Sequence, residues 1–182
     1  MPKKALILSD FLTLNPDQDT YLQITNSVLS EQWEVTMCSS RYLAGLTALH
    51  SKQQLHEAFI SGGIITAAEH VIQDAASYYD LAIGFSIGGT ILWKAVENYG
   101  LTLSKLICIS STRLRFEKSR LNPKTFLVYG VLDEYAPEQC LAMKLADKHK
   151  IIPQVGHDFY RHNPTLLKQT LITLMQENGL PL

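Results

Sequence analysis

Short apolar runs alternate with longer amphipathic stretches along the whole sequence. The runs are rich in isoleucine, leucine and valine, and most are continuously apolar: Ala5–Leu8, Glu34–Cys38, Leu81–Phe85, Leu106–Ser110, Thr125–Tyr129 and Lys150–Val155. A continuously apolar strand is typical of a parallel sheet that is covered on both faces, because a strand with one wet face alternates with polar residues. The runs therefore predict a mainly parallel sheet of about six strands.

The segments between these runs have the length and apolar spacing of amphipathic helices. They are Pro16–Glu31, Gly63–Tyr79, Gly88–Tyr99, Pro137–Lys148 and Pro164–Glu177, with a small additional helix at His50–Phe59. Gly100 is expected to cap the third of them. Strands that alternate with helices fold as an α/β protein, and right-handed crossovers place helices on both faces. We therefore expect a three-layer αβα sandwich, and no repeat or linker divides residues 1–182 into more than a single domain.

Charge and cysteine content exclude several other classes of protein. The chain carries 16 lysines and arginines against 17 aspartates and glutamates, so it lacks the cationic footprint of proteins that bind nucleic acid or an anionic membrane. Hydrophobic residues make up 46% of the chain and recur throughout it, which excludes intrinsic disorder. The three cysteines, Cys38, Cys108 and Cys140, have no paired spacing and predict no disulfide framework.

Targeting and metal-binding signals are also missing from the sequence. The first apolar run is only four residues long, whereas a secretory leader needs about 7–15 apolar residues and a membrane span about 18. We therefore expect a cytoplasmic protein. The histidines His50, His56, His70, His149 and His162 lack the spacing of metal ligands, so no metal site is expected.

The sequence Gly84-Phe85-Ser86-Ile87-Gly88-Gly89 contains the pattern G-x-S-x-G between a predicted strand and a predicted helix. A serine in this setting lies on a sharp turn at the carboxyl edge of the sheet. Glycines are needed where the strand and helix backbones leave no room for Cβ atoms, and the helix N-terminus directs free N–H groups toward the serine. The pattern predicts a nucleophile that attacks a carbonyl. A dinucleotide or triphosphate site is disfavoured, because serine replaces the central glycine of G-x-G-x-x-G and no Gly-Lys-Ser/Thr occurs.

A serine hydroxyl needs a base that takes its proton and an acid that orients the base. Asp133 follows the fifth apolar run and His157 follows the sixth, which gives the chain order Ser86, Asp133, His157 that this kind of nucleophile predicts. All three lie at carboxyl ends of parallel strands, where ligands bind in open α/β folds. Glu134 is a less favoured acid because its side chain is longer, and Asp158 is expected to make a loop hydrogen bond.

In these motifs the chain resembles the α/β-hydrolase superfamily nearly from end to end. The nucleophile turn of that superfamily matches Gly84–Gly89, its G-x-x-D acid loop matches Gly130–Asp133, and its histidine loop matches Gly156-His157.

The resemblance implies a role for each matched residue. Ser86 would be the nucleophile, His157 the general base and then acid, and Asp133 the orienting carboxylate. The backbone N–H groups of Ile87 and Phe11 would form the oxyanion hole. The implied activity is that of a carboxylesterase- or thioesterase-type serine hydrolase, which cleaves a small-molecule acyl ester or thioester through an acyl-enzyme, without a metal or organic cofactor, as a monomer or homodimer.

The chain departs from the superfamily at Ser9-Asp10, where members usually carry His-Gly after the first strand. A carboxylate at this place opposes a developing oxyanion unless it is turned away or paired. A catalytically silent binding protein with the same fold is therefore a second hypothesis. A flavodoxin-like ligand-binding domain, which uses the same sheet edge, is a third.

The chain is also short compared with the superfamily. The first strand begins at about residue 5, and only Ser111–Pro123 separates the two strands between which the superfamily commonly inserts a lid. The resemblance then implies the strand order 2-1-3-4-5-6, no separate lid and an open cleft.

The same short segment is strongly cationic. Between the fourth and fifth predicted strands, the chain carries Arg113, Arg115, Lys118, Arg120 and Lys124 against a single carboxylate, Glu117. Because this segment leaves the carboxyl edge of the sheet, it either attracts an anionic group of the substrate, such as a phosphopantetheine or coenzyme A thioester, or is a solvated loop.

Overall fold

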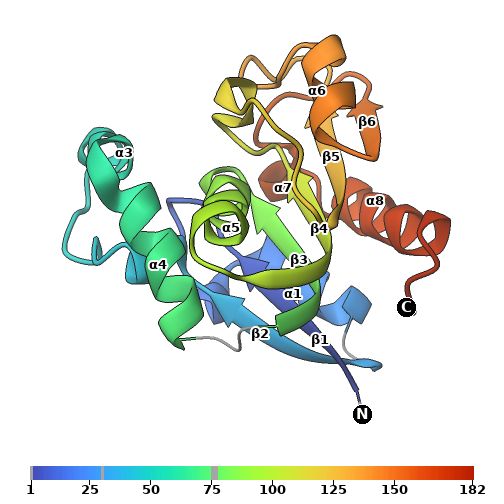
Figure 1. The fold of residues 1–182 in the computed structure, drawn as a ribbon, viewed down its shortest axis with the longest axis horizontal. Coiled ribbons are helices and arrows are strands. Elements are labelled where there is room, and N and C mark those ends of the chain that lie inside the picture. The colour runs from blue at the N-terminus through green and yellow to red at the C-terminus, as the bar shows by residue number, and fades with distance from the viewer. Residues whose placement is uncertain (1, 30, 75–77) are drawn as a thin grey trace.

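The structure is a computed structural model that describes residues 2–29, 31–74 and 78–182. Within these residues the strands form one sheet, entirely parallel, in the order β2-β1-β3-β4-β5-β6 (Figure 1). The strands are β1 (Lys3–Leu8), β2 (Trp33–Cys38), β3 (Tyr78–Phe85), β4 (Thr102–Ile109), β5 (Lys124–Gly130) and β6 (Lys148–Ile152). The predicted parallel sheet and its strand order are confirmed.

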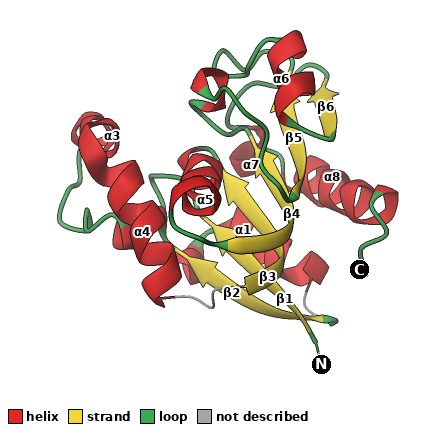
Figure 2. Ribbon diagram, viewed as in Figure 1, coloured by secondary structure: helices red, strands yellow, loops and turns green. Residues whose placement is uncertain are grey.

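Helices cover both faces of the sheet (Figure 2). The first face carries α1 (Thr20–Leu29), α7 (Phe159–His162) and α8 (Pro164–Glu177). The second carries α2 (Ser40–Leu43), α4 (Ile64–Asp74), α5 (Ile87–Asn98) and α6 (Gln139–Leu145). The helix α3 (Lys52–Ala58) and an irregular turn, Phe59–Gly63, precede α4. Short 3₁₀ turns occupy Pro16–Gln18 and Leu114–Phe116. The three-layer architecture expected from the sequence is confirmed.

The central strands are buried on both sides, which explains why their sequences are continuously apolar. In β1, Leu6 and Leu8 pack with the α4–α5 face, while Ala5 and Ile7 pack with the α1–α8 face. All four side chains are inaccessible to solvent. Burying a leucine or isoleucine contributes about 1.5–3 kcal/mol, so each face of the sheet is stabilised by its own hydrophobic core.

Two predicted helices are too long at their carboxyl ends. Tyr78 and Tyr79, placed in the helix Gly63–Tyr79, instead begin β3 and pair with β4, while residues 75–77 lie outside the described residues. Lys148, placed in the helix Pro137–Lys148, begins β6. In both places the backbone pairs with a neighbouring strand, and this outweighs the apolar spacing on which the prediction depended.

The last strand also begins and ends earlier than predicted. β6 covers Lys148–Ile152 instead of Lys150–Val155. Pro153 has no N–H for a strand ladder, and Gln154 has a left-handed φ of 60°, so the chain turns directly after Ile152. By contrast, the predicted cap of α5 is confirmed: Gly100 has a φ of 80°, and the N–H of the next residue bonds to the carbonyl of Ala95 at 3.2 Å.

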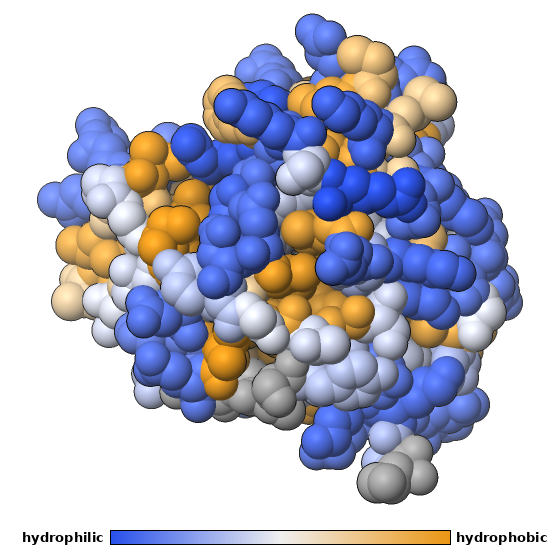
Figure 3. All heavy atoms as spheres, in the orientation of Figure 1, coloured by the Kyte–Doolittle hydropathy of each residue, from blue (hydrophilic) through white to orange (hydrophobic). Residues whose placement is uncertain are grey.

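The carboxyl ends of the central strands share one edge of the molecule with α3 and α6 (Figure 1). On the face shown in Figure 3, hydrophobic atoms reach the surface over the junction of α3 and α4, where Ile60 and Ile65 are both partly exposed. Among the described residues, no helix combines the length and the apolar character needed to cross a membrane.

Candidate active site

Ser86 lies on the turn between β3 and α5, with a backbone conformation that side-chain-bearing residues seldom adopt. Its φ is 50° and its ψ is −118°. The turn is held by the Ser86 N–H, which donates to the carbonyl of Ile109 at 3.0 Å. Strained backbone of this kind persists where the surrounding structure enforces it, and it is found mostly at functional sites.

The glycines of the motif are required by close backbone contacts. A Cβ at Gly84 would lie 2.5 Å from the Gly89 nitrogen, and a Cβ at Gly88 would lie 2.8 Å from the carbonyl oxygen of Leu8. Gly89 is equally tight, since its Cβ would lie 2.8 Å from the Ser111 Cβ. A side chain at any of these positions would push α5 away from the ends of β1, β3 or β4, so the glycines fix the position of Ser86.

The structure brings the side chains of Ser86, Asp133 and His157 into one chain of hydrogen bonds. Ser86 Oγ lies 3.0 Å from His157 Nε2, and His157 Nδ1 lies 3.0 Å from Asp133 Oδ2. Because a carboxylate only accepts, Nδ1 carries the proton of the neutral imidazole, which leaves Nε2 as the acceptor for the serine hydroxyl. Asp133 is buried, and its Oδ1 also accepts from the N–H of Tyr135 at 2.9 Å.

The loops that follow β5 and β6 are tied together, and this aligns the acid with the base. The N–H of Leu132 donates to the carbonyl of Val155 at 3.0 Å, and the N–H of Val131 donates to the carbonyl of Ile152 at 2.9 Å. Tyr135 packs its ring edge against His157, with the ring centres 5.0 Å apart. The imidazole is therefore fixed both by its hydrogen bonds and by an aromatic neighbour.

The weaker sequence candidates lie outside this hydrogen-bond chain. Glu134 is exposed. Asp158 directly precedes α7, and its backbone carbonyl accepts from the N–H of Arg161 at 2.9 Å, while no side-chain bond caps the helix. Burial raises the pKa of Cys108 to about 12, so this thiol is not a nucleophile at neutral pH. Among the described residues, no group of three histidine, cysteine or acidic side chains is arranged to hold a metal ion.

Ile87 and Phe11, which the sequence predicts as the oxyanion-hole residues, come to the cavity of Ser86 from two different elements. Ile87 is the first residue of α5, so its N–H has no partner within the helix. Phe11, in the loop after β1, lines the same cavity as Ser86 and Ile87. Its ring is held edge-on against His56 and Phe59 of the α3 region. The structure therefore brings both predicted oxyanion-hole residues to the wall of the cavity that contains Ser86.

Asp10 is paired and buried, so its carboxylate does not oppose a negative charge in the cavity. Arg161 contacts both of its oxygens, with Nη2 2.6 Å from Oδ1 and Nε close to Oδ2. The Tyr160 hydroxyl donates to Oδ2 at 3.0 Å, and the N–H of Leu12 donates to Oδ1 at 2.9 Å. The carboxylate that replaces the usual glycine is thus turned into the protein.

The pairing of Asp10 extends into a buried polar network. Arg161 also contacts Thr13 at 3.0 Å and Asp19 at 3.2 Å. Burial acts to lower the pKa of Arg161, but its hydrogen bonds to Asp10 raise that pKa above the ordinary value. Burial, assisted by the negative charge of Asp10, raises the pKa of Tyr160, which therefore stays a neutral donor. The sequence contains no local signal for this network, because Asp10 and Arg161 lie 151 residues apart.

Ser86 and His157 line a cavity of about 590 Å³. Its walls combine aromatic residues with cationic ones from separate elements: Phe11, Phe59, Tyr135 and Tyr160, and Lys52, Arg113 and Arg115. This volume lies within the usual range of about 300–1,000 Å³ for small-molecule sites.

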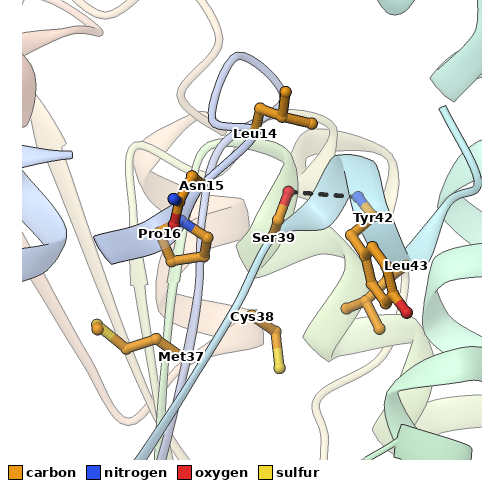
Figure 4. Close-up of a pocket in the computed structure, with 8 residues that line it drawn as sticks. All are labelled: Leu14, Asn15, Pro16, Met37, Cys38, Ser39, Tyr42 and Leu43. Carbon is orange, nitrogen blue, oxygen red and sulfur yellow. Dashed lines mark hydrogen bonds between the residues drawn. The ribbon is translucent and has the colours of Figure 1, made fainter. Parts of the chain in front are cut away.

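A second hollow, of about 320 Å³, lies at the carboxyl end of β2 and contains none of the predicted site residues (Figure 4). Met37 and Cys38 line it from the strand, and Leu14 and Pro16 line it from the loop before α1. Its remaining wall is the start of α2, where the Ser39 hydroxyl accepts from the N–H of Tyr42 at 3.3 Å. The two cavities are therefore chemically distinct, and only the larger one contains a nucleophile and a base.

Comparisons with known proteins give similarity in structure alone. No protein-family model and no curated protein matches the sequence. Among solved structures, a predicted CIB-like hydrolase from Thermoplasma acidophilum is similar with a TM-score of 0.68 and 16% identity, over 96% of this chain and 86% of that one. A serine hydrolase without a lid from Xanthomonas campestris has a TM-score of 0.61 and 16% identity, over 100% and 85%.

A third similar structure is the protein Est1E from Butyrivibrio proteoclasticus with ferulic acid bound, which has a TM-score of 0.64 and 14% identity, over 97% of this chain and 89% of that one. The same fold thus recurs over 85–89% of the length of these three chains, although their sequences differ from this one. The chain has the α/β-hydrolase fold, in a minimal version of it.

Proposed function

We propose that the protein is a serine hydrolase that cleaves a small ester or thioester through an acyl-enzyme. The observation that carries this proposal is the unbroken contact from Ser86 through His157 to Asp133, with 3.0 Å at each step. A buried carboxylate, an oriented imidazole and a strained serine are the groups that nucleophilic acyl transfer requires.

The first half of the reaction forms the acyl-enzyme. His157 Nε2 takes the Ser86 proton as Oγ attacks the carbonyl carbon of the substrate. The carbonyl oxygen gains a negative charge, which the N–H groups of Ile87 and Phe11 stabilise. The protonated His157 then gives its proton to the departing alcohol or thiol, and the carbon–oxygen or carbon–sulfur bond breaks.

The second half releases the acid. A water molecule takes the place of the leaving group, and His157 Nε2 removes its proton as the oxygen attacks the acyl carbon. The second tetrahedral intermediate uses the same N–H donors, and its collapse returns the proton to Ser86. Asp133 keeps Nδ1 protonated throughout and stabilises the imidazolium at each stage.

The size and walls of the cavity support a small acyl substrate. The site fits a ligand with one aromatic or short aliphatic portion, since Phe11, Phe59 and Tyr135 line it. Ferulic acid, bound in one of the structurally similar proteins, is an aromatic acid of this size class. The connection between β4 and β5 is short, from Ile109 to Lys124, which supports a substrate that enters the cleft directly from solvent.

The proposal is tested by labelling the intact protein with a fluorophosphonate probe and measuring its mass. We expect one adduct on the wild type and none on Ser86→Ala. Asp133→Asn is expected to lower kcat for a nitrophenyl ester by about 10⁴-fold, because the imidazole loses its orientation and tautomer. The matched control is Glu134→Gln at the adjacent exposed position, which should retain wild-type turnover.

Two outcomes would contradict the proposal. A correctly folded wild type that forms no adduct would favour the catalytically silent binding protein. Normal kcat in Asp133→Asn would show that Asp133 is not the orienting acid.

A further inference from the structure

Cationic side chains line the cavity on two sides. Lys52 comes from the beginning of α3, and Arg113 and Arg115 come from the turn after β4. The chain as a whole has a net charge of −1, so this concentration of positive charge is local. A cavity with one sign of charge raises the concentration of ligands with the opposite sign.

The cavity contains little negative charge to balance these cations. Asp10 is buried and paired with Arg161, which leaves Asp158 as the exposed carboxylate among the lining residues. The acidic residue of the arginine segment, Glu117, is paired with Lys94 at 2.7 Å. Within the described part of the chain, neither Arg113 nor Arg115 forms an ion pair.

The structure divides the cationic segment into two groups. Arg120 is paired with Asp147, and Lys118 is exposed and does not line the cavity. Lys124 begins β5, at the opposite edge of the sheet from the site. Of the cations in this segment, all of which the structure describes, Arg113 and Arg115 alone combine a place in the cavity wall with a charge that no carboxylate neutralises.

Both arginines are held in place by aromatic rings. Arg115 lies over the rings of Phe116 and Tyr135, at 4.7 and 5.5 Å, and its Nη1 donates to the Tyr135 carbonyl at 3.1 Å. Arg113 lies over the same Phe116 ring at 5.1 Å. A guanidinium has five N–H donors, so most of them are still available for a ligand, and stacking reduces the entropy lost when it binds.

The backbone at Arg113 is also unusual. Its φ of 68° is in the left-handed region, where glycine would be less strained. The turn therefore places a guanidinium at a position where a long side chain is conformationally unfavourable. Strain of this kind accompanies functional positions.

We infer that Arg113 and Arg115 bind an anionic group, a carboxylate or a phosphate, carried by the ester or thioester that Ser86 cleaves. The inference rests on the proposed hydrolase function. It makes the two arginines specificity determinants: they recognise charge, while Ser86 and His157 perform the chemistry. Guanidinium groups bind carboxylate and phosphate oxygens through paired hydrogen bonds.

Two matched substrate pairs test the inference and locate the charge. The first pair is 4-nitrophenyl hexanoate and the 4-nitrophenyl monoester of adipic acid, which differ by a carboxylate on the acyl group. The second pair is S-hexanoyl pantetheine and S-hexanoyl 4′-phosphopantetheine, which differ by a phosphate on the leaving group. We expect the wild type to favour the anionic member of at least one pair by 10-fold or more in kcat/KM.

The arginines are tested by the double variant Arg113→Gln/Arg115→Gln. The ratio of kcat/KM for the anionic over the neutral member should fall by about 10- to 100-fold, mainly through KM, because hydrogen bonds to charged groups are lost. If the double variant does not fold, Arg113→Gln alone should give part of this fall in the ratio. This substitution removes a side chain that packs on the Phe116 ring. Lys118→Gln is the matched control and should keep the wild-type ratio.

The outcomes separate the inference from the function on which it rests. A wild type that reacts with the fluorophosphonate and hydrolyses neutral members, but shows no preference for anionic ones, overturns the inference alone. So does a double variant that keeps the wild-type ratio. A folded wild type that neither reacts with the probe nor hydrolyses any member overturns the proposed function, and the inference with it.

Discussion

Arg161 neutralises the buried carboxylate of Asp10, which would otherwise be unfavourable beside the cavity. The carboxylate lies next to Phe11, whose N–H is proposed to bind the oxyanion, yet Arg161, Tyr160 and Thr13 occupy its oxygens. These hydrogen bonds hold the loop after β1 in place, at a position where a glycine would otherwise form the turn. In a buried ion pair of this kind, removal of either partner leaves the other as an uncompensated buried charge, which destabilises the fold.

Removing the positive partner should therefore destabilise the fold strongly. Arg161→Met leaves the Asp10 carboxylate buried without a counter-charge, and we expect the free energy of unfolding to fall by about 3–5 kcal/mol. Urea denaturation followed by circular dichroism measures this change. Asp19→Asn, which removes only the outer contact of Arg161, should lower stability by less than about 1 kcal/mol. Equal losses in the two variants would show that the Asp10 contact is not the important one.

At the level of elements, the site depends on how closely α5 approaches β1 and β3. Ser86 lines the cavity because the glycines around it allow the first turn of α5 to lie directly against the strand ends. The same helix ends at Gly100, where an added Cβ would meet nothing within 4 Å. Replacing glycine by alanine can therefore be compared at a crowded position, Gly88, and at an open one, Gly100, near the two ends of the same helix.

Gly88→Ala should abolish labelling of Ser86, because the added methyl group would overlap the carbonyls of Leu8 and Ser9 and displace the turn. We expect a loss of about 1–3 kcal/mol in stability, as for other overpacked sites. Gly100→Ala is the control: its left-handed backbone makes alanine unfavourable by about 1–2 kcal/mol, but labelling should continue. Probe reactivity and thermal denaturation of both variants are the measurements, and wild-type labelling of Gly88→Ala would contradict the expectation.

For the whole molecule, acid should reduce stability in two stages. Burial lowers the pKa of His149 below its ordinary 6.5, so the folded protein binds fewer protons than the unfolded chain as the pH falls below that value. Burial acts to raise the pKa of Asp147, but the hydrogen bonds from the Thr125 N–H and Arg120 outweigh it and lower that pKa below 3.8. The stabilisation that ionised Asp147 gives is therefore present above that pH, and it is lost as the pH falls through the lowered pKa. The contribution of Asp147 should be under about 1 kcal/mol, because the pair is partly exposed.

Urea denaturation between pH 7 and pH 3 separates these stages. His149→Gln should flatten the decline that begins near pH 6.5, and Asp147→Asn should flatten only the decline near pH 4 and below. If both variants follow the wild-type profile, other groups determine the acid sensitivity.

Much of the whole architecture could be predicted because its determinants are local in the sequence. A continuously apolar run indicates a strand that is buried on both faces. Ser86, Asp133 and His157 each come within a few residues of the end of a predicted strand. The limits of the helices near Tyr78 and Lys148 could not be predicted, because pairing with a distant strand decides them. The partner of Asp10 was equally hidden, since the chain holds 16 lysines and arginines and nothing near residue 10 selects Arg161.

The contact between Asp10 and Arg161 also has a consequence for protein synthesis. A ribosome makes the chain from its N-terminus, so Asp10, Phe11 and Ser86 leave the exit tunnel well before α7. A nascent chain therefore carries the serine while it still lacks both His157 and the arginine that neutralises Asp10. The chemistry that we propose for Ser86 therefore cannot begin until His157 and α7 have left the ribosome.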